Sequence, residues 1–317
     1  MSKLKLASYW GAACGGCDVA ILDIHEKIVD LSNAADIVFW PIAVDFKYSD
    51  LEAYEDGYID VCLFHGAVRN SENEHIAKLL RQKSKVMVAF GSCAISGGIP
   101  GLANFKKKDD IFARAYFDSP STQNKEKVLP VPVLQMPEGE IDIPEFYKDV
   151  KCLADVVDVE YYMPGCPPTS EQIWNVVLAI VTGQLPPAGS FVGCEDRALC
   201  NTCKRTKTDK KIKKFVRPHE IIVDPDLCLL EQGLVCMGPV TRAGCGNQCT
   251  GANTPCSGCY GPLSGVVDMG AKYISALASV VDADSPEEAD KIISEVLDPA
   301  GTFYRYGLPG SLLRRAK

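Results

Sequence analysis

The sequence predicts an α/β protein in which a doubly wound parallel sheet is followed by a smaller, irregular domain. In the first 100 residues, short apolar runs alternate with segments of helical periodicity, which is the pattern of strands and helices in an open parallel sheet. Beyond residue 188, cysteine, glycine and basic residues replace this pattern until Pro262. A chain of 317 residues is long enough for two domains, because single domains mostly contain ~100 to 200 residues. We therefore expect one domain over residues 1–188 and a second over residues 189–317.

The expected strands and helices alternate along the first domain. Apolar runs that suit buried parallel strands cover residues 4–10, 36–43, 59–64, 85–90 and 156–163. Apolar residues at helical spacing cover residues 19–31, 72–82 and 169–185. Thr169 and Gln172 form a capping pair at the start of the last of these helices. This order of elements predicts a flavodoxin-like doubly wound sheet.

Two other segments stand apart from this pattern. Residues 104–150 contain the charged run Lys106–Asp110 and prolines at 130, 132, 137 and 144, so we expect a long surface excursion that is useful for contacting a partner. In the second domain, Val266–Val281 is expected to form a closing helix, and Ser285 begins another helix. The cysteine-rich segment before them has few apolar side chains, so bound metal is expected to supply much of its folding energy.

Charge and hydropathy exclude several classes of partner. The net charge of −8 is dispersed, and the chain has no basic surface interleaved with aromatic residues, so we expect no nucleic-acid partner. The most apolar stretch, Trp174–Leu185, is far shorter than the ~20 residues of a membrane-spanning helix, so we expect no membrane contact. The first ten residues lack the continuous apolar region of a secretory signal, which predicts a cytoplasmic protein.

Cysteine is the extreme feature of the composition, with 15 residues. In a reducing cytoplasm, cysteines more often serve as metal ligands or redox groups than as disulfides. Cys14, Cys17, Cys93 and Cys166 each follow a predicted strand. Because loops at the carboxyl ends of parallel strands converge on one crevice, these four thiols are expected to meet and to hold a [4Fe–4S] cluster. A thioredoxin-like dithiol and a flavin site are the alternatives, but the dithiol leaves Cys93 and Cys166 unexplained.

The second domain carries two further sets of four cysteines. They are Cys200, Cys203, Cys228 and Cys236, and then Cys245, Cys249, Cys256 and Cys259. Spacing alone leaves zinc open, since paired C-x-x-C units are also typical of four-cysteine zinc sites. Electron transfer favours iron–sulfur clusters, because zinc transfers no electrons whereas a row of clusters uses all of these thiols. Of the remaining cysteines, Cys62 and Cys152 are expected to be inert core residues, while Cys194 is able to displace one assigned ligand.

Three further features have both a functional and a structural interpretation. Asp18 follows Cys17 and either relays protons or tunes the potential at the first cluster, or is a carboxylate favoured at a helix start. His65, like the three other histidines, lies away from the cysteine pairs, so we expect structural histidines. The segment Lys204–Arg217 contains eight basic residues, which form either a solvated face or a docking patch for an acidic electron-transfer partner.

Several motifs resemble those of the small subunit of nickel–iron hydrogenases. They are Cys14-x-x-Cys17, Gly91-x-Cys93-Ala-x-x-Gly97-Gly98, Pro-Gly-Cys166-Pro-Pro and the later cysteine-rich run, so the resemblance covers nearly the whole chain. The match looks like the gamma subunit of the cytoplasmic, methyl-viologen-reducing and F420-non-reducing branch, which works with heterodisulfide reductase in methanogens and some relatives. The resemblance implies an electron-transfer subunit with no nickel site of its own. Implied partners are a [NiFe] large subunit, an iron–sulfur delta-type subunit and heterodisulfide reductase subunits.

The resemblance also assigns the three sets of cysteines to clusters. The set that begins at Cys14 holds the proximal cluster. The set that begins at Cys200 holds the distal cluster, and it is all-cysteine, because Cys200 stands where many family members have histidine. The set that begins at Cys245 holds the medial cluster, which is often [3Fe–4S] in the family and becomes [4Fe–4S] if Cys249 is a fourth ligand. The alternatives are a zinc-stabilised interaction scaffold and the small cluster-bearing subunit of NADH:quinone oxidoreductase, a related family that shares only the α/β half.

Overall fold

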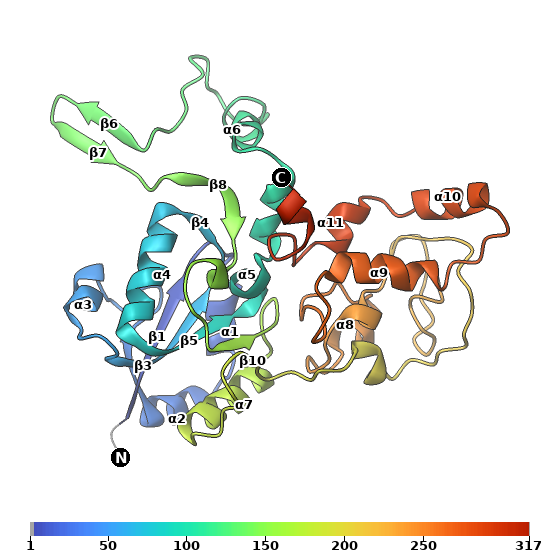
Figure 1. Cartoon of the computed structure of the whole chain (residues 1–317), viewed down its shortest axis with the longest axis horizontal. Coiled ribbons are helices and arrows are strands. Elements are labelled where there is room, and N and C mark those ends of the chain that lie inside the picture. Colours follow the sequence, from blue (N-terminus) through green and yellow to red (C-terminus); the bar gives the residue numbers. More distant parts are fainter. Residues whose placement is uncertain (1–2, 317) are drawn as a thin grey trace.

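A computed structural model describes residues 3–316 and shows a six-stranded parallel sheet in the N-terminal part of the chain (Figure 1). Its strands are β1 (Leu4–Trp10), β2 (Ala35–Phe39), β3 (Ile59–His65), β5 (Ser84–Phe90), β9 (Tyr161–Met163) and β10 (Ser190–Phe191). They lie in the order β10-β9-β5-β3-β1-β2. This is the strand order of a flavodoxin-like sheet with one more strand at its edge, so the predicted fold class is confirmed. β10 joins the sheet just beyond the domain boundary expected near residue 188.

Helices cover both faces of the sheet, as its apolar strands require. One face packs against α1 (Gly16–Leu22), α2 (Lys27–Ala34) and α7 (Ser170–Val181), and the other packs against α3 (Tyr48–Ala53), α4 (Ser71–Lys83) and α5 (Gly91–Ser96). In β3, Val61 and Leu63 belong to the first core, whereas Cys62 and Phe64 belong to the second. Cys62 is fully buried there, in agreement with its predicted role.

Three predicted elements differ from the observed ones. The helix expected over residues 19–31 is divided into α1 and α2, because His25 has a φ of 57°, a left-handed conformation that an α-helix cannot contain. The strand expected over residues 36–43 ends at Phe39, and the Trp40 side chain turns inward to donate a hydrogen bond from Nε1 to Asp18 Oδ1 at 2.7 Å. The strand expected over residues 156–163 is reduced to Tyr161–Met163, since η2 (Leu153–Asp155) and the turn after it occupy the preceding residues.

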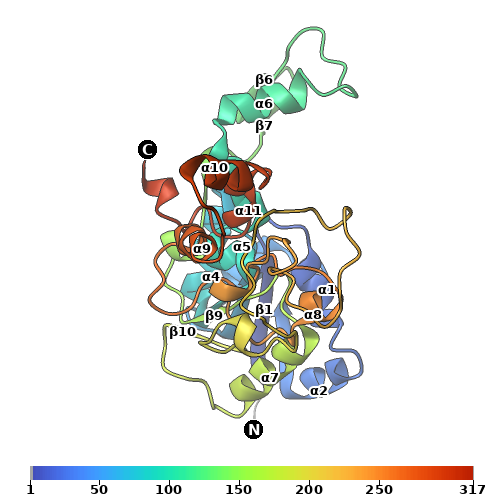
Figure 2. The same ribbon diagram turned by 90° about the vertical axis from the view of Figure 1, so that its right-hand side faces the viewer.

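The predicted surface excursion is present and projects away from the body of the protein (Figures 1 and 2). It follows η1 (Ile99–Phe105) and contains α6 (Lys108–Tyr116) and a hairpin of β6 (Val133–Met136) and β7 (Gly139–Asp142). The chain returns through β8 (Phe146–Lys151), which pairs antiparallel with β4 (Val68–Asn70). Because β4 comes just after β3, the excursion is anchored beside the carboxyl edge of the parallel sheet. Residues 117–145 are called the arm below.

The second domain has little regular structure but has a core of its own. Its elements are η3 (Leu199–Asn201), η4 (Gly238–Val240), α8 (Gln248–Gly251), α9 (Met269–Ala278), α10 (Pro286–Ser294), α11 (Pro299–Phe303) and η5 (Leu313–Ala316). Its core includes Leu199, Phe215, Met237, Tyr273 and Phe303. The cysteine-rich segment contributes Leu199, Phe215 and Met237 to this core, while α9 and α11 contribute Tyr273 and Phe303. Among residues 3–316, no helix is long and apolar enough to cross a membrane.

Candidate metal centres

The first set of thiols lies at the carboxyl edge of the parallel sheet. Cys14 and Cys17 follow β1, Cys93 lies in α5 directly after β5, and Cys166 follows β9. The pKa of Cys17 is raised by burial and then by the neighbouring charges of Cys93, Cys166 and Cys14. Burial, together with Cys166 and Cys14, raises the pKa of Cys93 to about 12. The structure thus brings together the four thiols that sequence reasoning grouped, and buried thiols such as Cys17 and Cys93 stay protonated unless a cation offsets their charge.

Glycine backbone packs directly on two of these thiols. A Cβ atom at Gly91, where φ is +82°, would lie 2.7 Å from Cys17 Sγ. A Cβ atom at Gly98, where φ is +52°, would lie 2.5 Å from Cys93 Sγ. Both positions therefore need glycine for conformation and for space, as expected where backbone must approach a bound group closely. Gly16 adds a backbone N–H that lies 3.4 Å from Cys14 Sγ.

The second set gathers in the second domain around η3 and η4. Burial raises the pKa of Cys200 to about 12, and Cys236, Cys228 and Cys203 contribute to this shift, while the positive charge of Lys207 opposes it. The pKa of Cys236 is likewise raised by burial, with contributions from Cys228 and Cys203. Cys236 Sγ also accepts a hydrogen bond from the backbone N–H of Cys256 at 3.3 Å. These four thiols are therefore neighbours, as their spacing suggested.

The third set contains Cys245, Cys249, Cys256 and Cys259. The pKa of Cys259 is raised to about 12 by burial and then by Cys245, Cys166 and Cys249. Burial and the neighbouring Cys236 and Cys259 raise the pKa of Cys256. Cys256 thus lies between the second and third sets.

Cys194, the residue left open by the sequence, has a different environment. Burial raises its pKa to about 11, and the charged groups that act on it are Arg242, Asp196 and Glu195. Cys249, by contrast, interacts with Cys245 and Cys259, two thiols of the third set. Cys249 therefore acts on thiols of the third set and Cys194 does not, although Cys194 lines a cavity together with Cys203 and Cys245.

The three sets form a row rather than three isolated groups. Cys166 of the first set is close enough to Cys259 of the third set to act on its pKa. Ser92, next to Cys93, has its Oγ 2.8 Å from Gly165 O and 2.5 Å from Cys259 O. At the other end, the Cys256 N–H to Cys236 Sγ bond joins the third set to the second. Sequence reasoning did not identify Ser92 as a residue that links two sets. The available signal was its position in the Gly91-x-Cys93 motif, directly before a predicted ligand.

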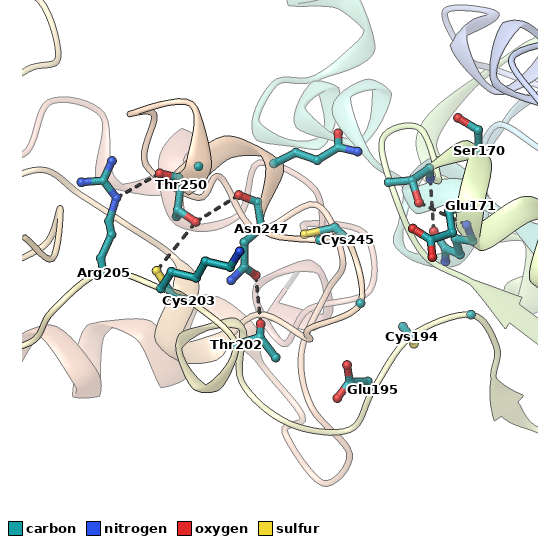
Figure 3. A pocket seen from close by; sticks show the side chains of 18 of the residues that line it. Ser170, Glu171, Cys194, Glu195, Thr202, Cys203, Arg205, Cys245, Asn247 and Thr250 are labelled. Atoms are coloured by element: carbon teal, nitrogen blue, oxygen red, sulfur yellow. Dashed lines mark hydrogen bonds between the residues drawn. The ribbon is translucent and has the colours of Figure 1, made fainter. Parts of the chain in front are cut away.

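A cavity of about 1200 Å³ opens beside the second and third sets (Figure 3). Cys194, Cys203 and Cys245 line it from different loops, with mostly polar neighbours. Thr250 fixes two of these loops, because its Oγ1 accepts from Cys203 Sγ at 3.8 Å and its carbonyl accepts from Arg205 Nε at 2.9 Å. Within residues 3–316, no three His, Cys, Asp or Glu side chains are arranged to hold a single metal ion. The loops therefore leave space beside the thiols for a group larger than one ion.

The buried carboxyl group of Asp18 lies close to the first set of thiols. Asp18 lies in the first turn of α1, and its Oδ1 accepts a hydrogen bond from Trp40 Nε1 at 2.7 Å and lies 2.9 Å from His65 Nε2. His65 is fully buried, as expected of a structural histidine. The Asp18 carboxylate also contributes to the raised pKa of Cys17. Both interpretations of Asp18 thus have support, since the residue stands at a helix start and its charge reaches the first set.

Comparisons with known proteins agree with this organisation. The family described as NADH ubiquinone oxidoreductase, 20 Kd subunit, matches residues 14–180, which contain the first set but none of the later thiols. The iron–sulfur subunit of the F420-non-reducing hydrogenase from Archaeoglobus profundus is 44% identical over 98% of this chain and 98% of its own. A subunit of the F420-non-reducing hydrogenase from Methanothermobacter thermautotrophicus is 37% identical over 98% of this chain and 96% of its own.

A solved structure of an NAD+-reducing [NiFe]-hydrogenase in the H2-reduced state is also similar. It is 28% identical, with a TM-score of 0.50, and the match covers 58% of this chain and 94% of that one. The two F420-non-reducing relatives extend through the cysteine-rich domain, whereas the match to the oxidoreductase subunit stops before it. The relatives also imply iron–sulfur clusters and a hydrogenase large subunit as partner. The chain belongs to the family of F420-non-reducing hydrogenase iron–sulfur subunits, and it is therefore an electron-transfer subunit of an oxidoreductase.

Proposed function

We propose that this chain is the small subunit of a cytoplasmic [NiFe] hydrogenase and passes electrons from H2 oxidation at the large subunit through three iron–sulfur clusters to an acceptor such as a heterodisulfide reductase complex. The observation that carries this proposal is the row of three thiol sets, which are linked by the Ser92 Oγ to Cys259 O bond and the Cys256 N–H to Cys236 Sγ bond. When bound, such clusters supply one-electron redox chemistry at potentials set by their hydrogen bonds and exposure.

The thiol environments support a specific assignment. Cys14, Cys17, Cys93 and Cys166 would hold the proximal cluster, the set from Cys200 to Cys236 the distal cluster, and the set from Cys245 to Cys259 the medial cluster. Backbone amides that donate to thiol sulfurs, such as Gly16 N–H and Cys256 N–H, would stabilise the charge of the ligands. Because Cys249 completes the medial set, all three clusters are of the [4Fe–4S] type in this proposal.

The exposed side of the proximal set is the proposed docking face for the large subunit. Cys14 and Cys166 are exposed, whereas Cys93 is buried, so a partner is able to approach the set from the carboxyl edge of the sheet. The nickel–iron site would belong to that partner. The arm is anchored at the same edge, which makes it a natural second contact for the same subunit.

The hairpin of the arm has a polar face and an apolar face. Leu134 lies opposite Ile141, and the alternation of strands places Met136 and Ile143 on the same side. These four side chains are exposed by 42 to 55%. An isolated two-stranded hairpin is only marginally stable in water, and exposed apolar patches commonly mark interfaces. We propose that the large subunit covers this apolar face.

Metal analysis tests the proposed function directly. We expect the anaerobically purified chain to contain about twelve iron and about twelve acid-labile sulfide atoms, as three cubanes require. Zinc without sulfide would support the interaction scaffold instead, and about four of each would support a subunit with only the proximal cluster.

Iron and sulfide analysis also tests whether Cys249 or Cys194 is a ligand of the medial cluster. Cys249→Ser should lower iron to about eleven while sulfide stays at about twelve, because a cubane that loses one ligand converts to a [3Fe–4S] cluster. Cys194→Ser is the matched control and should leave both values unchanged. An iron loss in the Cys194 variant alone would reverse the assignment.

The acceptor partner is proposed to dock on the basic segment near the distal set. Of its eight basic residues, Arg205 is buried and therefore contributes to neither a solvated face nor a docking patch. Its guanidinium donates instead to the carbonyls of Thr250, Asp224 and Leu227. The exposed members are Lys204, Lys207, Lys210, Lys211, Lys213, Lys214 and Arg217. Lys207 reaches the distal set itself, since its Nζ donates to Cys200 O at 3.1 Å.

Charge reversal tests this docking surface. Exchanging Lys210, Lys211, Lys213 and Lys214 for glutamate should weaken acceptor binding about tenfold or more at low ionic strength, and the difference should shrink as salt is added. Affinity is measured with the purified acceptor complex over a salt series. Four exposed lysines of the α/β domain serve as the matched control, namely Lys3, Lys78, Lys85 and Lys148. Equal affinities for the two variants at low salt would contradict the proposal.

A further inference from the structure

Tyr273 is a buried tyrosine at the centre of the second domain. It lies on α9, and its side chain is fully buried. Its ring packs edge-on against Phe303, with centroids 5.0 Å apart and an interplanar angle of 73°. It shares an apolar core with Met237, Cys236 and Cys256. The phenol ring therefore has a fixed position between the closing helices and the cysteine loops.

The hydroxyl group of Tyr273 makes no hydrogen bond of standard geometry within residues 3–316, although the backbone N–H of Cys236 is close enough to lower its pKa. An unpaired hydroxyl in an apolar core is destabilising, so native proteins rarely leave one unsatisfied. Phenylalanine would fill the same space without this cost. A tyrosine at this position therefore indicates that its hydroxyl meets a polar group that the protein chain itself does not provide.

Cys236 and Cys256 pack in the same apolar core as Tyr273. Burial raises the pKa of Tyr273, and the charges of Cys236, Cys256 and Cys200 raise it further, in that order. A phenol keeps its proton at neutral pH and therefore serves as a hydrogen-bond donor. Two of these three residues, including the one with the largest effect, belong to the distal set.

We propose that the Tyr273 hydroxyl donates a hydrogen bond to a sulfur of the distal cluster, an inference that rests on the proposed function. A donor to sulfur stabilises the reduced state, which carries one more negative charge, and so raises the reduction potential. Tyr273 is a positioning residue in this scheme, because it sets the potential of the last cluster before the acceptor. The sequence does not identify Tyr273 as such a residue, because the evidence is its unpaired hydroxyl group, which is visible only in the folded core.

A redox titration of Tyr273→Phe in the assembled hydrogenase, followed by EPR, tests this inference. At the midpoint potential of the unsubstituted protein, the oxidised-to-reduced ratio of the distal cluster should rise about tenfold, which corresponds to a shift of about 59 mV to lower potential for a one-electron couple. The proximal and medial potentials should stay unchanged. An unchanged distal potential with full iron content would overturn the inference, and so would a shift confined to the medial cluster.

Tyr260→Phe is the matched control. Tyr260 is equally buried, at 1% exposed, but its hydroxyl already donates to Gln172 Oε1 at 2.5 Å. Its removal should leave the distal potential unchanged. A distal shift equal to that of Tyr273→Phe would show a general packing effect and would also overturn the inference.

A second measurement does not depend on the stability of the variant. In the unsubstituted protein grown with ring-deuterated tyrosine, pulsed EPR of the reduced distal cluster should detect deuterium coupling from Tyr273. Tyr260 and Tyr306 lie near thiols of the other two sets, so they do not substitute for it. A distal signal without deuterium coupling would refute the contact alone, whereas the absence of any distal signal would refute the proposed function.

Discussion

Cys93→Ala should reduce hydrogenase turnover to background while the other two clusters remain visible by EPR. Cys93 is buried, and the backbone of Gly98 packs directly on the Cys93 sulfur, where even a Cβ atom on Gly98 would not fit. Neither of the remaining core cysteines, Cys62 and Cys152, acts on the pKa of this set, so no replacement ligand is at hand. Without the fourth thiol, the proximal set cannot hold a [4Fe–4S] cluster, and this change at the entry point interrupts electron transfer from the large subunit.

The experiment measures H2-dependent reduction of the acceptor complex by the reconstituted hydrogenase, together with EPR spectra of the reduced sample. Cys62→Ala is the matched control, because Cys62 is a fully buried cysteine of the same sheet and has an apolar environment. That variant should lose some stability but keep its turnover. Normal turnover in Cys93→Ala would falsify the assignment of the proximal set.

Sheet topology explains why the proximal set was predictable from sequence. Cys14, Cys93 and Cys166 are far apart in the chain, but each follows a buried apolar run, and parallel strands deliver their following loops to one edge. The later thiols were grouped by their paired spacing, and the structure keeps these groups together. Both predictions depend on patterns in the local sequence, namely an apolar run before each thiol and the paired spacing of the later cysteines.

Other features depend on long-range contacts that a single sequence does not contain. The pattern of apolar residues continues through His25, so the break between α1 and α2 was invisible in it. Our proposal of Cys249 rather than Cys194 as a ligand rests on the charges around each thiol, which spacing does not show. Tyr273 occupies an ordinary apolar position of a helix, and only the folded core shows that its hydroxyl makes no hydrogen bond of standard geometry among residues 3–316. Tertiary environment, rather than spacing, decides these three cases.

The second large effect is expected on binding of the large subunit, when the apolar residues of the arm are replaced. Because these residues are exposed in the free chain, their replacement should change assembly without changing folding. Exchanging Leu134, Met136, Ile141 and Ile143 for threonine should weaken binding of the large subunit. Each side chain is about half exposed in the free chain, so each loses roughly 1 kcal/mol of burial in the complex. A sum of about 4 kcal/mol corresponds to an increase in Kd on the order of a thousandfold.

The opposite face of the hairpin provides the matched control. Its residues are Val133, Gln135, Glu140 and Asp142. Threonine at these positions preserves strand propensity and leaves the apolar face intact, so the Kd for the large subunit should change little. Both variants should retain the thermal stability and iron content of the unsubstituted chain, because all eight side chains are exposed in it. Equal Kd values for the two variants would mean that the large subunit does not cover the apolar face, and the docking face would then be limited to the surroundings of Cys14 and Cys166.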